Sequence, residues 1–299
     1  MTTAGSIRIG ISGWTYVPWR GTFYPDKLPH KDELKFAAGL FNSIEINGTF
    51  YTLQRPASFA RWARETPDDF VFSVKGPRFI THMKRLKDVE APLANFFSSG
   101  LFELGHKLGP ILWQLPPNFR YQPETLEKFF SLLPRHTQQA ALLAEKHDDR
   151  MNGRCITEPI FHQPIRHALE IRNDTFAVPE FIELLRKYEV ALVCADTVEW
   201  PRLMDLTSDF MYCRLHGSEI LYVSGYTPKA LDRWAEKVVA WANGSEPPDA
   251  EKVIDSPAPP MEGRDVFVYF DNDAKVRSPV DAQSLRERVE RKSTRVIVP

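Results

Sequence analysis

Eight short apolar segments recur along this chain, and a helix-length pattern follows nearly every one of them. We predict strands at residues 7–12, 43–47, 70–75, 111–114, 167–172, 191–196, 211–216 and 266–270. We predict helices at residues 34–40, 58–65, 93–103, 124–133, 179–188, 230–243 and 282–291. Strands that alternate with helices pair in parallel. Eight such units predict an α/β protein with a closed (β/α)8 barrel of the TIM type.

Three stretches depart from this regular pattern. Residues 198–208, after the sixth strand, contain no convincing long helix. Two insertions, residues 134–166 (with a helical pattern at 137–147) and 243–264, each connect a helix to the next strand. We therefore expect both at the N-terminal face of one barrel domain spanning residues 1–299, away from the chemistry, as surface decoration or a subunit contact. The oligomeric state stays open.

An open doubly wound sheet is the alternative architecture. Such a sheet often carries the sequence G-x-G-x-x-G after its first strand, where it binds a dinucleotide, and that pattern does not follow residues 7–12. The closed barrel is therefore the favoured prediction.

Composition and charge exclude several classes of protein. The chain is 43% hydrophobic, which argues against disorder. Its 38 basic residues nearly balance 39 acidic ones, so no general attraction to nucleic acid or anionic lipid is expected. No apolar run approaches the roughly 18 residues that a membrane span requires.

The cysteines and the start of the chain bear on the compartment. The chain has three cysteines, which lie far apart without a C-x-x-C pair, and this argues against a zinc site. Cys194 and Cys213 fall in apolar runs and are expected in the core. Residues 1–7 lack the basic and apolar regions of a secretory signal. We expect a cytoplasmic protein with reduced thiols.

The ends of the predicted strands carry the candidate site. Side chains of a barrel strand alternate between the interior and the helix layer. The last interior positions are almost all polar, and they are Glu45, Asn47, Lys75, Gln114, Glu170, Arg172, Asp196, Arg214 and His216. The eighth strand runs into Asp271, Asn272 and Asp273, of which Asn272 is the candidate binding residue. We predict that these side chains meet at the C-terminal mouth, although ion pairs such as Glu170–Arg214 could alone satisfy the charges.

The residue types at these positions indicate the kind of ligand. Four cations suit a phosphate or carboxylate, namely Lys75, Arg78, Arg172 and Arg214. Glu45 or Glu170 is the candidate general base or acid, with His216 as proton partner. His82 follows the third strand and is a binding residue or simply a hydrogen-bonded loop residue.

Aromatic residues crowd the same rim. They either stack on a base or sugar or belong to a plug that seals the first loop onto the barrel. These residues are Trp14, Tyr16, Trp19, Phe23, Tyr24, Phe50, Tyr51, Tyr222 and Tyr226, and the candidate binding residues among them are Trp14, Tyr51 and Tyr226. The carboxylates and imidazoles could also hold a divalent metal, but the sequence lacks H-x-H and H-E-x-x-H spacing. A metal cofactor is left open.

Three hypotheses for the function follow. The leading one is an enzyme that hydrolyses or isomerises a small anionic substrate, expected to be phosphorylated, with Asn47 and Gln114 orienting it. The second is a nucleic-acid-binding protein or a metal-dependent nuclease-like enzyme, which the balanced charge does not favour. The third is a non-catalytic anion-binding scaffold. In the leading hypothesis, replacing Arg214 with alanine abolishes anion binding and leaves the fold intact.

Several short motifs resemble those of the YecE-like family, also called domain of unknown function seventy-two. They are GISGWTY at residues 10–16, EINGTFY at 45–51, FSVK at 72–75, QLPP at 114–117 and RLHG at 214–217. The resemblance spans nearly the whole chain and implies a TIM-type barrel in a bacterial or archaeal cytosolic protein. It implies no reaction. By fold analogy the family has been compared with apurinic endonuclease and sugar isomerase barrels, which use metals.

One position departs from the family pattern. After the fifth strand the family usually has Arg-His followed by Ser and an aromatic residue, whereas this chain has Arg172 and Asn173. Asparagine is a poor substitute for a histidine that ligates a metal or moves a proton. A metal role for this loop is therefore in doubt, while the anion-binding arginine is retained.

Overall fold

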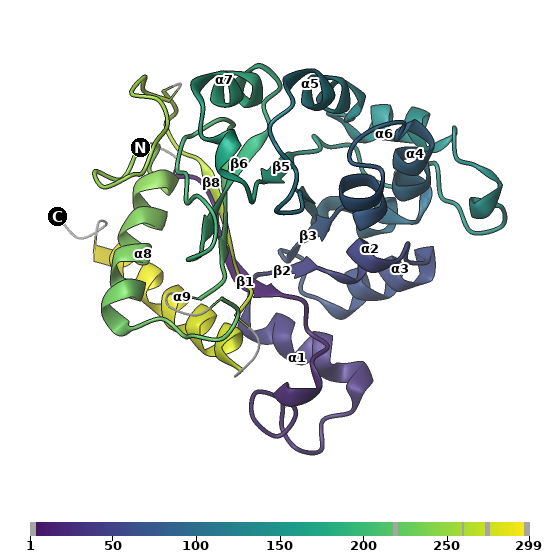
Figure 1. Cartoon of the computed structure of the whole chain (residues 1–299). Helices are drawn as coiled ribbons and strands as arrows, with labels where there is room; N and C mark the ends of the chain where they lie inside the picture. Colours follow the sequence, from purple (N-terminus) through teal and green to yellow (C-terminus); the bar gives the residue numbers. More distant parts are fainter. Residues whose placement is uncertain (1–3, 218–220, 259, 273–275, 296–299) are drawn as a thin grey trace.

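The computed structural model describes residues 4–217, 221–258, 260–272 and 276–295, with side chains up to residue 292. Its strands form a closed parallel barrel in chain order, with β8 hydrogen-bonded to β1 (Figure 1). The strands are β1 Ile7–Ser12, β2 Ser43–Ile46, β3 Val71–Lys75, β4 Leu108–Gln114, β5 His167–Glu170, β6 Ala191–Asp196, β7 Phe210–Leu215 and β8 Asp265–Phe270. The predicted α/β class and the closed barrel are confirmed.

Helices surround the barrel on its outside (Figure 1). They are α1 Glu33–Leu40, α2 Gly48–Tyr51, α3 Pro56–Glu65, α4 Glu90–Ser98, α5 Pro123–Leu132, α6 Thr137–Ala144, α7 Pro179–Lys187, α8 Pro228–Ala242 and α9 Arg277–Arg295. Proline starts α3, α5, α7 and α8, where its fixed φ suits the first turn and its missing N–H has no helical partner to lose.

One predicted helix is divided in the structure. The pattern at 93–103 corresponds to α4 followed by a 3-10 segment, Leu101–Lys107. Gly100 separates them with a φ of 115°, a left-handed conformation that ends the helix and that glycine adopts without a Cβ clash.

The stretch after β6 has no helix, as predicted, because the second insertion packs there. The Met204 N–H donates to the Glu251 carbonyl, and the Asp205 carboxylate accepts the Val253 and Ile254 N–H groups at 2.9 and 3.2 Å. The insertion thus covers the part of the barrel that a sixth regular helix would cover.

The first insertion leaves the N-terminal end of the barrel and then runs along α4. The Asp148 N–H donates to Asn95 Oδ1 at 3.0 Å, and the Ile156 N–H donates to the Ser98 carbonyl. Arg150 and Arg154 of this insertion line a side cavity of about 260 Å³ beside the loops that follow β2 and β3. The middle of the insertion therefore reaches closer to the mouth than its two ends suggest.

Two apolar cores hold the barrel. The larger core lies between strands and helices, and the smaller fills the barrel interior with Leu112, Ala168, Ala191, Val193, Phe210, Tyr212, Phe267 and Tyr269. This assignment corrects the predicted phase of β6: Leu192 and Cys194 belong to the outer core, and the smaller Ala191 and Val193 face the interior. Both Cys194 and Cys213 are buried, as expected.

No helix among the described residues has the length and apolar character that a bilayer span would need.

The close approach of β1 to β2 depends on Gly10. A methyl group there would lie 1.8 Å from the Ser43 backbone oxygen, so Gly10→Ala must push the strands apart. We expect its unfolding free energy, measured by urea denaturation, to fall by about 1–3 kcal/mol. The control is Gly39→Ala in α1, where an added Cβ meets nothing within 4 Å and stability should hold or rise. Equal stability of the two variants would contradict the close approach.

Candidate functional site

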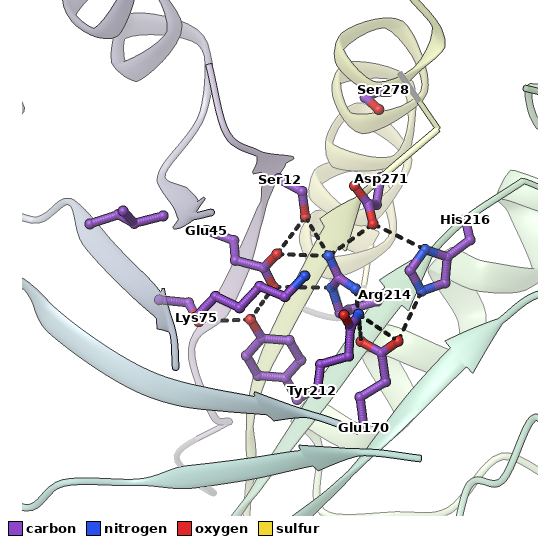
Figure 2. Close-up of polar contacts among 12 residues, drawn as sticks. Ser12, Glu45, Lys75, Glu170, Tyr212, Arg214, His216, Asp271 and Ser278 are labelled. Atoms are coloured by element: carbon purple, nitrogen blue, oxygen red, sulfur yellow. Dashed lines mark hydrogen bonds and ion pairs between the residues drawn. The ribbon is translucent and has the colours of Figure 1, made fainter. Parts of the chain in front are cut away.

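The Arg214 guanidinium lies at the centre of the barrel mouth and is fully buried. It donates to Glu45 Oε1 at 2.9 Å, to Glu170 Oε2 at 2.7 Å and to Asp271 Oδ2 at 2.9 Å (Figure 2). A fourth contact, to Ser12 Oγ, is 3.3 Å. Three carboxylates therefore share one cation, and Arg214 spends its donors on the protein itself.

The Glu45 side of this network is held from below. Tyr212 donates to Glu45 Oε2 at 2.5 Å, and Ser12 donates to Glu45 Oε1 at 2.7 Å. Tyr212 in turn lies 2.7 Å from Ser73 Oγ. Burial and the neighbouring Glu45 raise the pKa of Tyr212, so the phenol stays protonated and can donate.

The Glu170 side is held by two more residues from the mouth. Gln114 Nε2 donates to both Glu170 oxygens at 3.1 Å, and Arg172 donates to Glu170 Oε1 at 2.8 Å through Nε. Burial alone would raise the pKa of Glu170, but Arg172 and Arg214 hold it well below its usual range. Glu170 is therefore ionised at neutral pH and holds both arginines in place.

Asp271 completes the network and touches His216. Its Oδ2 lies 3.2 Å from His216 Nδ1, while His216 Nε2 lies 3.7 Å from Glu170 Oε1. Neither ring nitrogen makes a hydrogen bond of standard geometry to a described residue. Burial lowers the pKa of His216, with Arg214 adding to the effect against Asp271 and Glu170. Although burial opposes ionisation of Asp271, Arg214 and His216 lower its pKa to about 2.

A cavity of about 700 Å³ opens above this network. Seven of the predicted residues line it, namely Trp14, Asn47, Tyr51, Lys75, His82, Gln114 and Arg172. Glu45, Glu170, Arg214 and His216 are fully buried and do not line it. The predicted acid, base and proton partner are therefore brought together, but in the layer that supports the cavity.

Lys75 differs from the other charged residues of the mouth. It extends from β3 toward the Arg214 network, and its side chain is buried (Figure 2). Its ammonium lies 4.3 Å from the centre of the Phe50 ring, and no hydrogen bond or ion pair joins it to another described residue. Burial and Arg214 lower its pKa to about 8, against the opposing effect of the carboxylates.

His82 lies on the cavity wall, where burial and neighbouring charges change its pKa. Its Nδ1 lies 2.9 Å from Thr81 Oγ1, and its ring packs edge-on against Phe50. Burial has the largest effect on the pKa of His82, and together with the charges of Lys75, Arg172 and Arg78 it lowers that pKa to about 4 against the opposing effect of Glu170. The imidazole is therefore neutral at physiological pH, and three cations act on it.

The remaining four predicted residues lie outside both this cavity and the network below it. Arg78 lines the neighbouring side cavity, 5.7 Å from the Tyr51 ring. Asp196, predicted to face the interior, instead points outward because β6 turns its small residues inward; it accepts from Arg202 and from Trp234 of α8. Tyr226 packs on Phe270 on the same helix side.

Asn272 is the fourth, and it organises the start of α9. It is buried, donates to Asp281 Oδ2 at 2.9 Å and hydrogen-bonds Ser278. The interior phase of β8 falls on Asp271 instead, because Phe267 and Tyr269 occupy the barrel interior. The prediction of Asn272 as a mouth residue was wrong by one position.

Three further cavity residues come from segments that the sequence analysis singled out without choosing them as site residues, namely Tyr16, Tyr222 and Asp271. Counting alternate positions along β8 from Tyr269 selects Asp271 rather than Asn272, and Asp273 lies outside the described residues. Gln54 and Trp62 also line the cavity and were not predicted.

The aromatic rim divides into residues that seal the first loop and residues that line the cavity. Trp19 and Tyr24 are buried in a ring cluster that also holds Phe23, and this cluster seals the first loop. Trp14 and Tyr16 line the cavity instead.

Asn173 has a structural role in place of the family histidine. Its Oδ1 accepts from Thr175 and caps the short helix Asp174–Phe176, while its Nδ2 donates to the Pro117 carbonyl. Within the described residues no group of three or more His, Cys, Asp or Glu side chains is arranged to hold a metal ion. The carboxylates of the mouth are instead shared with Arg214.

The buried network corrects the expectation that Arg214 is dispensable for folding. Arg214→Met would leave Glu45, Glu170 and Asp271 buried with little compensating charge. We expect the free energy of unfolding to fall by about 3–5 kcal/mol, measured by urea denaturation. Arg61→Met is the control, because Arg61 forms only an exposed pair with Glu65 and should change stability by about 0.5 kcal/mol. A stable Arg214→Met protein would refute the central role of this residue.

The stability of the fold should also depend on pH. Glu170 and Asp271 have lower pKa values in the fold than in the unfolded chain, so unfolding takes up protons as the pH drops. The free energy of unfolding should therefore fall from about pH 5 toward pH 2, and it should be fully present above that range. Asp271→Asn should be less stable at pH 7 and show a shallower decline, measured by denaturation across pH. An unchanged slope would contradict the low pKa of Asp271.

Comparison with known proteins identifies the family. The family model "Protein of unknown function DUF72" matches residues 8–299. The UPF0759 protein YunF of Bacillus subtilis is 29% identical over 125 residues, which are 40% of this chain and 43% of YunF. The UPF0759 protein YecE of Escherichia coli K12 is 31% identical over 113 residues, 38% of this chain and 39% of YecE. The matched segments thus span less than half of these relatives.

Solved structures extend the likeness across the fold. A DUF72 family protein from Thermotoga maritima superposes with a TM-score of 0.72 at 25% identity, covering 95% of this chain and 99% of that one. One from Enterococcus faecalis, 16% identical, has a TM-score of 0.67, covers 95% of each chain and supports the fold alone. With a family model matched over nearly its full length, the chain belongs to the DUF72 family.

Proposed function

We propose that this protein is an enzyme that hydrolyses or isomerises a small anionic substrate, with a phosphorylated one foremost, in the cavity at the barrel mouth. One observation carries the proposal. Lys75 and Arg172 line a single cavity, and Lys75 has no anionic partner within ion-pair distance among the described residues. A buried cation without a partner is costly, and an anionic ligand would relieve that cost.

The local charges favour an anion. Arg214 meets carboxylates on three sides, so its guanidinium is occupied by the protein. Lys75, Arg172 and Arg78 all act on His82 and, after burial, lower its pKa further. Arg172 uses Nε and Nη2 for Glu170, which leaves Nη1 for a ligand. Asn47 Oδ1 is buried without a described partner and can accept a hydrogen bond from substrate.

The proposal assigns proton transfer to groups that line the cavity. Asp271 is ionised and His82 is neutral at neutral pH, so both are in the form that accepts a proton. Glu45 and Glu170 are fully buried and tied to Arg214, so we assign them the positioning of the mouth. His216 then supports Asp271.

A small molecule fits this site better than a nucleic acid does. The cavity of about 700 Å³ lies within the usual size range for small-ligand sites. The net charge of −1 provides no broad basic surface for a polyanion.

Binding of inorganic phosphate tests the proposal. Calorimetry on the wild-type chain should show binding, and Lys75→Met or Arg172→Gln should weaken it at least ten-fold, corresponding to about 1.4 kcal/mol. Lys75→Met breaks no hydrogen bond or ion pair to a described residue, so its fold should survive, which circular dichroism checks. Arg61→Gln on α3 is the control. Phosphate affinity that is unchanged in both cavity variants would exclude this site.

A further inference from the structure

We propose that Lys75 is a nucleophile, and that the substrate of the mouth cavity is an anionic aldehyde or ketone that Lys75 binds covalently as an imine. The inference rests on the proposed function, since it takes the cavity as an anion site, and it adds the substrate class and the reacting atom. It begins from a contrast between two buried lysines of this chain.

Lys107 shows how a buried lysine is ordinarily satisfied. Its Nζ donates to the carbonyls of Ala63 and Thr66 at 2.7 and 2.8 Å and to Thr66 Oγ1 at 3.3 Å. All three donors are thus directed at the protein. Lys75 is buried to a similar extent and lines the cavity, yet no hydrogen bond or ion pair joins its Nζ to a described residue. The Phe50 ring lies 4.3 Å away, and the charges of the Arg214 network act on the ammonium. Lys75 can therefore contact a ligand in the cavity, because its ammonium is not used to hold the fold together.

The surroundings of Lys75 favour the free amine, which is the nucleophilic form. Burial and the positive charge of Arg214 make the ammonium less stable, and the pKa of about 8 leaves a reactive fraction at neutral pH. Titratable groups from five parts of the barrel act on Lys75 or share its wall. They are Glu45 of β2, Glu170 of β5, Arg214 of β7, Asp271 after β8 and His82 after β3.

The covalent step balances without a further reactant. The Lys75 Nζ lone pair attacks the carbonyl carbon, and one proton passes from nitrogen to oxygen to give a neutral carbinolamine. A second proton, taken from solvent, converts the hydroxyl into water, which leaves as the C–O bond breaks and the nitrogen lone pair forms the protonated C=N. Asp271 and His82 line the same cavity and can accept and relay the proton that moves from nitrogen to oxygen. The protonated imine keeps the positive charge and withdraws electrons from the adjacent carbon, which is the requirement for isomerisation of a carbonyl compound.

Reductive trapping tests this proposal on the full chain. Glyceraldehyde 3-phosphate and pyruvate are incubated separately with the protein and sodium cyanoborohydride, and the labelled lysine is identified by peptide mass spectrometry. We expect the peptide with Lys75 to be labelled at least ten-fold faster at pH 7 than exposed lysines such as Lys187, and Lys107 to remain unlabelled. Inorganic phosphate should slow the labelling of Lys75.

Two further measurements distinguish the nucleophilicity of the Lys75 amine from its positive charge. Lys75→Arg retains a cation but not a nucleophile, so it should lose the label entirely. The labelling rate at Lys75 should rise with pH and level off above about pH 8, whereas labelling of exposed lysines should keep rising toward pH 10. A rate at Lys75 that follows the exposed lysines would overturn the proposal.

The outcomes distinguish this inference from the proposed function. If phosphate binds and the cavity variants weaken it, but neither carbonyl probe labels Lys75 faster than exposed lysines, the imine is wrong and the anion site stands. If phosphate does not bind and Lys75 is not labelled, both are wrong. Preferential labelling that phosphate slows supports both.

Discussion

The sharing of one buried guanidinium by three carboxylates is the constraint on which the mouth of this barrel depends. Glu45, Glu170 and Asp271 come from three separate parts of the chain, and Arg214 contacts all of them. Burying any one of these charges alone would be strongly unfavourable. Arg214 contacts all three, Arg172 pairs with Glu170, and the charge of Lys75 acts on Glu170 and Asp271, so the carboxylates are stabilised. The strands that carry these groups are thereby held at defined positions around the lumen.

This network also determines which groups remain available for a ligand. Because Arg214 satisfies the carboxylates, Lys75 is left without a partner of its own among the described residues. Arg214 lowers the pKa of both Asp271 and Lys75. A carboxylate and a titratable amine therefore border one cavity. The buried network around Arg214 therefore influences the groups that line the cavity above it.

Much of the fold could be predicted from the sequence, because strand alternation is a local property. The interior phase was correct for Glu45, Lys75, Gln114 and Arg214, where polar residues alternate with large apolar ones. It failed at Asp196, because both faces of β6 are apolar and only the sizes of its side chains differ. It stopped one residue beyond the correct position at Asn272, where the strand had already ended.

The sequence by itself determined the barrel, the order of its strands and the polar character of their C-terminal ends. Only the tertiary structure decided that Arg214 is spent on the protein and that Lys75 is not. The reason is that β7 hydrogen-bonds to β6 and β8, whereas Glu45 and Glu170 lie on β2 and β5 and meet Arg214 across the lumen. Contacts between strands that are not neighbours depend on the diameter and register of the closed barrel, which no local pattern specifies.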